Sequence, residues 1–443
     1  MQDNEDNRGK HTLNIAIIGG GYAGMAAAVR LSESGIPVTV FESARQLGGR
    51  ARGVSCNDTQ LDNGQHLLLG CYRQTLHMIK KVGGNPETDF LRLPLQLDLH
   101  GKFSLKAPQL PAPLHLLAAL LGAHGLALSA RLSAVRFMRA LRGINFHLSN
   151  DITVAALLAQ YGQNEDLVMK LWEPLCIAAL NTPIRKASAQ VLLNVLRDAL
   201  DRSRADSDML LPRIDFTALF PQRAADYVER HGGKVSIACG VEALHPFEDY
   251  IEITTAQDSE KFSHAICATS PAVAAKLLRP VPALAETVAQ IDRLEQQPIY
   301  TVYLQYPEHI NLPQPMLGLQ QRYSQWLFDR GRIAGQHGLI AAVISAEGIH
   351  QELPQEEVAQ HVIAELREEF GITEQPRWFK VIAEKRATFC CSPNLQRPSQ
   401  FTLLPRLLLA GDYTAGDYPA TLEGAVMSGL KCADALVIQP GKK

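Results

Sequence analysis

The sequence predicts an α/β fold, because a strand, a turn, a helix and a second strand follow one another near the start of the chain. Residues 15–18 are a run of four apolar residues, which is typical of a buried parallel strand. Small residues over 25–31 then indicate a helix that ends at Gly35 and Pro37, before a second strand over 38–41. Alternating strands and helices favour a parallel sheet with helices on its faces.

Glycines between the first strand and the helix have the spacing of a dinucleotide-binding turn. Gly19, Gly21 and Gly24 follow the pattern G-x-G-x-x-G. The first makes the tight turn, the second lets the backbone approach a pyrophosphate, and the third lets helix and strand pack closely. Ala23 lies where the helix begins, and its end offers free N–H groups to phosphates. Glu42 ends the second strand, where a carboxylate can accept hydrogen bonds from a ribose diol.

A second glycine-rich segment follows the second strand directly. Two adjacent glycines allow another close approach of backbone to ligand, and arginines, including Arg52, place positive charge beside a pyrophosphate. The alternative is a surface turn with solvated arginines. Because the segment follows a dinucleotide unit, we expect it to bind the dinucleotide through Ser43, Arg45, Gly48, Gly49 and Arg50.

Bulk composition excludes several classes of protein. With 443 residues, 46% of them hydrophobic and 20% charged, the chain is long enough for two globular domains. A net charge of -2 argues against nucleic acid as a partner. No stretch reaches the roughly 18 apolar residues that a spanning helix needs, and residues 1–11 do not resemble a signal peptide.

The eight cysteines are scattered, with no C-x-x-C and no metal-ligand spacing with histidine, so no metal site is expected. We interpret the neighbouring Cys390 and Cys391 as two reduced thiols in a strand. This cysteine usage predicts a cytoplasmic location, with peripheral contact to the inner face of the membrane left open.

The G-x-G-x-x-G unit, Glu42 and the R-x-x-G-G-R element over 45–50 together resemble the flavin amine oxidase and carotenoid desaturase superfamily. The resemblance implies FAD as the cofactor, bound by a Rossmann-type domain that is assembled from separated segments. A helical run and a strand lead into Val241, which matches a residue that contacts the adenine through its backbone. Residues 262–268 read as a further strand of the same domain.

Residues 407–436 complete the resemblance near the other end of the chain. A buried strand over 407–410 precedes a glycine-containing loop and a helix over 421–436. The start of this helix can offer N–H groups to a flavin carbonyl or phosphate, and the aspartate can bond ribityl or phosphate-side hydroxyls. The motif implies contacts to FAD from Gly411, Asp412, Thr421, Glu423, Gly424 and Ala425.

Other segments resemble the hydroxysqualene dehydroxylase branch of this superfamily. They are LDNGQHLLLGCY over 61–72, WEPLCIAALNTP over 172–183 and KRATFCCSP over 385–393. The first places Gly64, Gln65 and His66 among the residues expected to contact the cofactor. The resemblance implies replacement of the allylic hydroxyl of hydroxysqualene by hydride from reduced FAD, which gives squalene. Implied partners are a long apolar isoprenoid substrate, the enzymes that form hydroxysqualene, and an unidentified electron donor.

The implied reaction needs an acid or a hydrogen-bond donor, because hydroxide is a poor leaving group. His66 and Asp62 are the candidate acids, and histidine titrates near neutrality. The alternative is that His66 bonds a flavin or backbone carbonyl while Asp62 caps a turn. Glu173 and Asn181 could polarise a substrate oxygen or serve packing alone. Cys176 could be a nucleophile only with a lowered pKa.

Three other functions remain compatible with these motifs. A carotenoid or phytoene-type desaturase would share fold, cofactor and apolar tunnel, and would take hydride from a polyprenyl chain. A flavin amine oxidase would call for an aromatic cage, yet the sequence has 3 Trp and no paired aromatics near the last motif. A non-catalytic lipid carrier would not need two intact FAD motifs.

We expect the FAD-binding domain to comprise residues 13–90, 210–275 and 400–440, and an α+β substrate-binding domain to comprise 91–209 and 276–399. Residues 107–147 form a helical lid region that is apolar at first and then carries Arg131, Arg136, Arg139 and Arg142. It is either an element at a membrane surface through which a lipid enters, or a core helical hairpin with one solvated face.

Overall fold

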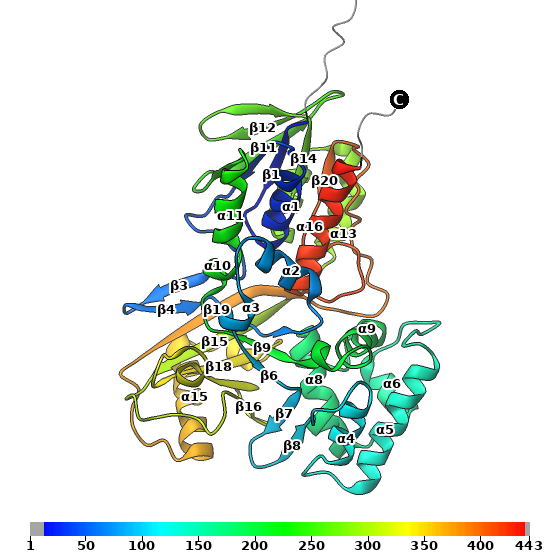
Figure 1. Ribbon diagram of the computed structural model, residues 1–443, viewed down its shortest axis with the longest axis vertical. Helices are drawn as coiled ribbons and strands as arrows, with labels where there is room; N and C mark the ends of the chain where they lie inside the picture. The colour runs from blue at the N-terminus through cyan, green and yellow to red at the C-terminus, as the bar shows by residue number, and fades with distance from the viewer. Residues whose placement is uncertain (1–12, 439–443) are drawn as a thin grey trace, which may run out of the picture.

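The computed structural model describes residues 13–438, in which two sheets lie at different levels of the molecule (Figure 1). The upper sheet is parallel, with the strand order β10 (Lys234–Ser236), β2 (Val38–Phe41), β1 (Ile15–Ile18), β14 (His264–Cys267) and β20 (Leu407–Leu409). Its central strand, β1, is fully buried, as its apolar sequence predicts. The expected Rossmann-type α/β domain built from discontinuous segments is therefore confirmed.

Helices pack on this sheet through small residues. They are α1 (Tyr22–Glu33), α11 (Pro221–Arg230) and α16 (Leu422–Val437). A Cβ on Gly24 would lie 2.0 Å from the carbonyl oxygen of Gly19, and one on Gly429 would lie 2.1 Å from that of Ala23. These contacts confirm the packing role predicted for Gly24, and they bring the two ends of the chain together.

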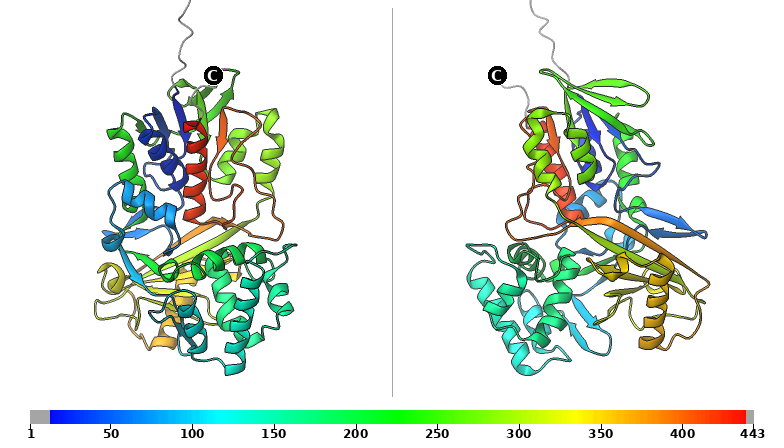
Figure 2. Two further views of the ribbon diagram at one scale, coloured as in Figure 1. Left: turned by 45° about the vertical axis from the view of Figure 1, so that its right-hand side comes forward. Right: turned by 180° about the vertical axis from the view of Figure 1, so that it is seen from behind.

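A connection in the upper domain corrects one predicted boundary. Between β10 and β14 lies an antiparallel sheet of β11 (Val241–Pro246), β12 (Ile251–Thr255) and β13 (Ser259–Phe262). After β14 come α12 (Pro271–Leu278), η3 (Pro282–Leu284) and α13 (Ala285–Asp292). Figures 1 and 2 place α13 beside α16, so residues 276–292 belong to the upper domain and not to the substrate-binding domain. They continue the crossover from β14, and only β15 leads into the lower domain.

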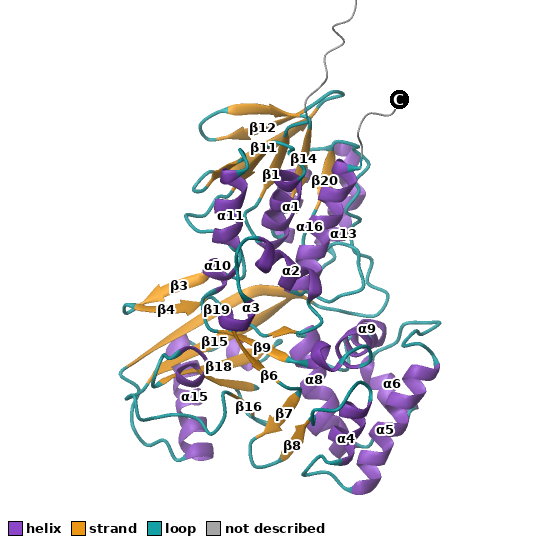
Figure 3. Ribbon diagram, in the orientation of Figure 1, coloured by secondary structure: helices purple, strands orange, loops and turns teal. Residues whose placement is uncertain are grey.

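The lower domain contains the seven-stranded sheet (Figure 3). Its strand order is β19 (Trp378–Phe389), β15 (Gln296–Gln305), β18 (Leu339–Ser345), β17 (Trp326–Asp329), β16 (Met316–Gly318), β7 (Gln96–Leu99) and β8 (Phe103–Lys106). Helix α15 (Gln355–Phe370) packs on β19 and β15, and α14 (Arg330–Ala334) and η4 (Ile349–Gln351) lie in connections of this domain.

A helical layer lies beside that sheet. It comprises α4 (Leu114–Leu121), α5 (Leu128–Gly143), α6 (Val154–Gln160), α7 (Glu165–Leu167), η1 (Val168–Trp172), α8 (Glu173–Leu180), α9 (Ala189–Leu200) and η2 (Arg204–Ser207). The predicted helical region over 107–147 is the hairpin of α4 and α5, which buries one face and exposes leucines on the other. Within residues 13–438, no helix combines the length and the apolar character that crossing a membrane requires.

Short elements join the two domains. They are the pair β3 (Gly53–Cys56) and β4 (Thr59–Asp62), the sheet of β5 (Leu68–Leu69), β9 (Met209–Pro212) and β6 (Phe90–Leu93), and the helices α2 (Arg73–Lys81), α3 (Pro86–Asp89) and α10 (Phe216–Leu219). Since β5 and β6 pair with β9, segments far apart in sequence meet between the domains.

Candidate cofactor and substrate site

A cavity of about 750 Å³ is lined by both domains. From the upper domain it receives the loops that follow β1, β2 and β20. From the lower domain it receives α9 and the strands β15 to β19. The carboxyl ends of parallel strands, where ligands bind in open α/β sheets, therefore face a second domain.

The glycine turn forms one wall of this cavity. Gly19 adopts φ +112°, and a Cβ there would lie 2.6 Å from the carbonyl oxygen of Ala268. Gly21 forms a bridge with Gly48, and the nearest atom to a Cβ on Gly21 would be 3.9 Å away. The two glycine segments thus lie next to each other with no side chain between their backbones and the cavity. A side chain at Gly21 would fill the open space beside this backbone. Ala23, in the first turn of α1, lines the same wall.

Glu42 is held rigidly at the end of β2. Its Oε2 accepts a hydrogen bond from the backbone N–H of Gly20 at 2.7 Å, and its Oε1 accepts one from that of Ala44 at 2.8 Å. The carboxylate is buried and lines the cavity together with Ser43 and Val241. A fixed acceptor beyond the second strand is where a ribose diol is expected.

Two arginines of the glycine–arginine loop differ from expectation. Arg45 is exposed and lies outside the cavity lining, so its predicted contact to the dinucleotide has no support from the geometry and stays a prediction. Arg50 lines the cavity but donates from Nη1 to the carbonyl oxygen of Ala387 at 2.7 Å and from Nη2 to Asp412 Oδ1. Burial lowers the pKa of Arg50, but the contact with Asp412 outweighs it, so the net shift is upward. Arg50 therefore joins three distant segments instead of holding its charge free for a pyrophosphate.

The C-terminal motif divides into lining residues and supporting ones. Gly411, Asp412, Thr421 and Ala425 line the cavity. Thr421 also caps α16, because its Oγ1 accepts from the backbone N–H of Gly424 at 3.1 Å. Gly424 itself does not line the cavity, although Leu422 and Ala425 do, so its predicted contact to the cofactor stays a prediction.

Glu423 also has a different role from the one predicted. Its carboxylate accepts from the backbone N–H groups of Gln74 at 2.9 Å and Thr75 at 2.8 Å, and from the Thr75 hydroxyl at 2.7 Å. It therefore caps the start of α2 and does not face the cavity. Burial raises the pKa of this carboxyl despite these bonds. The sequence around Glu423 could not reveal this capping role, because the helix that Glu423 caps lies far away in the chain.

The segment Gly64–His66 lies on the cavity wall. His66 Nδ1 is 2.7 Å from the carbonyl oxygen of Gly64, which makes Nδ1 the protonated nitrogen and leaves Nε2 as an acceptor. Burial lowers the pKa of His66 to about 4, so the ring is neutral at pH 7. The lowered pKa disfavours an imidazolium at this position, and the contact of Nδ1 with the Gly64 carbonyl agrees with the alternative of a bond to a backbone carbonyl. The role of His66 in catalysis stays a prediction. Gln65 Oε1 is buried without a hydrogen-bond partner in the described structure.

Asp62 does not line the cavity, so its predicted catalytic role has no support from the geometry and stays a prediction. Its Oδ1 accepts from the backbone N–H of Phe216 at 2.8 Å, and its own carbonyl accepts from the Tyr303 hydroxyl at 3.0 Å. Burial raises the pKa of Asp62 to about 7. The carboxyl supports the start of α10 beneath the cavity wall.

The 172–183 segment contributes apolar residues to the cavity wall, such as Leu175 and Leu180, while its polar candidates have other contacts. Asn181 lines the cavity, yet its Nδ2 donates to the Pro298 carbonyl at 3.1 Å and to Thr388 Oγ1 at 3.0 Å. Its Oδ1 accepts from the backbone N–H of Ala346 at 2.7 Å, so its bonding capacity is used. Glu173 lies outside the lining. Cys176 does too, and burial raises its pKa to about 12, so the condition set for a nucleophile is not met.

The apolar part of the cavity comes partly from the 61–72 and 172–183 segments, through residues such as Leu69, Leu175 and Ile177, and partly from elements without a sequence motif. Its walls include Leu192, Val195, Leu196, Met209, Met316, Trp326, Phe328 and Val343. Polar exceptions that the sequence did not reveal are Gln296, Arg386 and Tyr418. The alternation of side chains along a strand predicts which face of the sheet a residue lies on. It does not predict which residues line a cavity, because the opposite wall of that cavity belongs to the other domain.

The residues present fit a flavin dinucleotide. Bare backbone faces the cavity at Gly21, a fixed carboxylate lies at Glu42, and Gln65 Oε1 has an unused acceptor that a ligand N–H or hydroxyl would satisfy. Gly21, Glu42, Gln65 and Val241 would hold the cofactor together with the start of α16.

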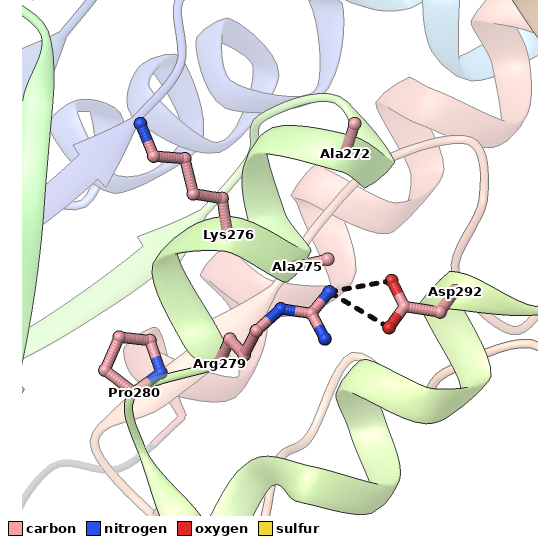
Figure 4. A pocket seen from close by; sticks show the side chains of 6 residues that line it. All are labelled: Ala272, Ala275, Lys276, Arg279, Pro280 and Asp292. Atoms are coloured by element: carbon pink, nitrogen blue, oxygen red, sulfur yellow. Dashed lines mark hydrogen bonds and ion pairs between the residues drawn. The ribbon is translucent and has the colours of Figure 1, made fainter.

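A second hollow on the upper domain lacks these features (Figure 4). It is lined by Ala272, Ala275, Lys276, Arg279, Pro280 and Asp292. The Arg279 guanidinium is paired with Asp292 at 3.0 Å, so its charge is already compensated.

Comparison with known proteins identifies the family of this chain. Residues 22–437 match the family described as flavin containing amine oxidoreductase. The chain belongs to this family. It is an FAD-dependent oxidoreductase.

Relatives and a solved structure extend this result. The chain is 28% identical to a hydroxysqualene dehydroxylase of Sinorhizobium fredii, over 95% of this chain and 97% of the relative. It is 25% identical to a zeta-carotene desaturase of Zea mays, over 94% of this chain and 82% of the relative. Its fold is similar to that of cyclohexylamine oxidase from Brevibacterium oxydans, with a TM-score of 0.70 at 18% identity over 97% and 99% of the two chains.

Proposed function

We propose that this chain is a hydroxysqualene dehydroxylase, which replaces the allylic hydroxyl of hydroxysqualene by hydrogen to give squalene. The observation that carries the proposal is that a single cavity combines the dinucleotide cradle with a largely apolar wall from the lower domain. The relative from Sinorhizobium fredii, which has this name, aligns over nearly its full length, including both domains.

Reduced FAD, when bound, supplies the hydride for this reaction. The chain has three tasks: to hold the long apolar substrate, to keep water from an allylic cation, and to assist the departing oxygen. Side chains such as Leu196, Met316 and Phe328 serve the first two tasks, because an apolar wall binds an isoprenoid and offers no site to water.

Assistance to the departing oxygen falls to neutral groups. His66 is neutral at pH 7, and its Nε2 can only accept a hydrogen bond. Gln65 has one weak bond from Nε2 to the His66 carbonyl at 3.4 Å and an unpartnered Oε1. Its carboxamide can therefore donate to a substrate oxygen and accept from the hydroxyl proton, which orients the leaving group.

The second candidate is a desaturase of a polyprenyl hydrocarbon, which the similarity to the zeta-carotene desaturase of Zea mays supports. Both reactions use the same fold, cofactor and apolar wall. Products distinguish them, because a dehydroxylase consumes hydroxysqualene and a desaturase adds conjugated double bonds.

The test is to incubate the purified holoenzyme with hydroxysqualene and dithionite, and to analyse the extracted lipids. We expect squalene to form, and a Gln65→Leu variant to lose turnover even when it is saturated with added FAD. Bound flavin with unchanged hydroxysqualene would refute the assignment. A His66→Gln variant should show the same pH dependence between pH 6 and 8 as the unaltered enzyme, because the ring does not titrate there.

The proposed activity requires an electron donor and enzymes that form hydroxysqualene, and no nucleic acid. We also propose a cytoplasmic location. It is supported by the cysteines, all eight of which lie in the described part of the chain as free thiols.

A further inference from the structure

The hairpin of α4 and α5, with the residues just before it, has six leucines that are each at least 38% exposed in the described structure. On α4, Leu114, Leu117 and Leu121 recur at the spacing of one helix face, and Leu114 is 49% exposed. On α5, Leu128 is 63% exposed and Leu132 is 41% exposed. We call this surface the leucine face; it consists of Leu110, Leu114, Leu117, Leu121, Leu128 and Leu132.

Hydrogen bonds tie the two leucine-bearing helices to each other. Arg131, in the first turns of α5, donates to the carbonyl oxygens of Leu121 at 3.1 Å and Leu126 at 2.9 Å. The end of α4 is thereby tied to the start of α5. Figures 1 and 2 show both helices side by side at the end of the molecule opposite the Rossmann sheet.

The hairpin already has a separate face that packs on the protein. In α4 this face includes His115 and Leu116, and in α5 it includes Ala134, Phe137 and Leu141, all of them buried. The leucine face is therefore not needed for packing the hairpin. Single exposed leucines are ordinary on protein surfaces, but a grouped row marks an interaction site.

Charge around the leucine face indicates what covers it. Residues 101–150 contain no Asp or Glu, in a chain whose net charge is -2. Their basic residues are Lys102, Lys106, Arg131, Arg136, Arg139 and Arg142. Arg142 pairs with Asp201, whereas Arg136 and Arg139 are exposed and pair with no carboxylate among residues 13–438.

We propose that the leucine face docks on a bilayer that contains anionic lipid, with the leucines in the acyl boundary and Arg136 and Arg139 at the level of the phosphates. Leucines beside basic residues without acidic ones are the composition of an interfacial helix, and the short hairpin lies on the bilayer instead of crossing it.

The position of the hairpin suits the delivery of a lipid, an extension that rests on the proposed function. His115, on the buried side of α4, has its Nε2 3.3 Å from Ser207 Oγ, and Ser207 lines the cavity. One helix therefore separates the bilayer from the cavity wall. A substrate with no solubility in water could pass from membrane to cavity without crossing solvent.

The test uses purified holoenzyme and flotation with vesicles, without any substrate, so its outcome does not depend on the proposed reaction. One set of vesicles is phosphatidylcholine alone and the other is equal parts of phosphatidylcholine and phosphatidylglycerol. We expect binding to the second set that weakens with added salt. Arg136→Ser combined with Arg139→Ser should reduce partitioning by about fivefold for each residue, and Leu117→Ser combined with Leu128→Ser should abolish it.

Matched controls lie outside the hairpin. Leu403→Ser removes a leucine that is 76% exposed, and Arg293→Ser removes an exposed arginine; both variants should bind as the unaltered protein does. Flavin absorbance and melting temperature establish that each variant folds. The proposal is overturned if neither vesicle set binds, if the controls lose binding equally, or if the double leucine variant binds undiminished. It is also overturned if the double leucine variant only converts a dimer to a monomer, since the face would then cover a second copy of this chain.

Discussion

Replacement of Arg50 should weaken FAD binding through Asp412 and not through a direct contact to phosphate. In the structure Arg50 bonds to Asp412 and to the Ala387 carbonyl, and so ties the glycine–arginine loop to two segments that line the cavity. In Arg50→Met the Asp412 carboxylate, whose side chain is 8% exposed, would lack its cation. Breaking a buried ion pair costs about 3–5 kcal/mol. Arg50 itself is 30% exposed, so water can partly replace it, and we expect about 2 kcal/mol.

That cost corresponds to a dissociation constant for FAD about thirtyfold higher. The assay is fluorescence titration of apoprotein with FAD for Arg50→Met, Asp412→Asn and the double variant. Because the carboxamide in Asp412→Asn is neutral and does not need the cation, the double variant should bind FAD nearly as well as Asp412→Asn alone. Effects that add within about 0.5 kcal/mol would show no coupling. Such additivity would refute the ion-pair argument. It would favour the original prediction that Arg50 contacts the pyrophosphate directly.

Three further predictions concern the scaffold of the site. Gly24→Ala should yield protein without flavin, because its Cβ would lie 2.0 Å from the carbonyl oxygen of Gly19; Gly143→Ala, where no atom lies within 4 Å of the added Cβ, should keep normal absorbance. Glu423→Ala should lower the free energy of unfolding by about 2 kcal/mol, because two N–H groups at the start of α2 lose their acceptor, and Glu423→Gln should recover part of the loss by thermal melting. Asp62→Asn should stabilise the protein at high pH. The folded pKa of Asp62 is about 7 against an ordinary 3.8, so ionisation penalises the folded state increasingly from pH 4 to pH 7, by up to about 4 kcal/mol. A gap in melting temperature between Asp62→Asn and the unaltered protein that does not widen over this range would contradict the reasoning.

Local sequence patterns predicted most of the residues of the candidate cofactor site. The glycine turn, Glu42 and the helix that follows Thr421 were readable because each depends on a few neighbouring residues and on backbone geometry. The same patterns predicted cofactor contacts for Arg45, Glu423 and Gly424, none of which lines the cavity. Motif position says that a residue is near a ligand, but the direction of its side chain depends on what else packs there, such as the start of α2 beneath Glu423.

The pKa values of the two candidate acids also could not be predicted from the local sequence. His66 and Asp62 are separated by three residues in the chain, yet burial moves the pKa of one down to about 4 and of the other up to about 7. Desolvation disfavours the charged form of each group, which is cationic for histidine and anionic for aspartate. Burial is a property of the assembled domains, so neither value could be read from the segment alone.

The sequence by itself determined the α/β class, the dinucleotide unit around Gly19 and Glu42, and the second motif that completes the FAD site, because short-range backbone requirements select those residues. Only the tertiary structure decided which side chains line the cavity, that Arg50 is paired with Asp412, and that the hairpin keeps a leucine face outside the core. Those features arise where segments hundreds of residues apart come into contact, and close packing and the exclusion of water act on whatever surfaces meet there.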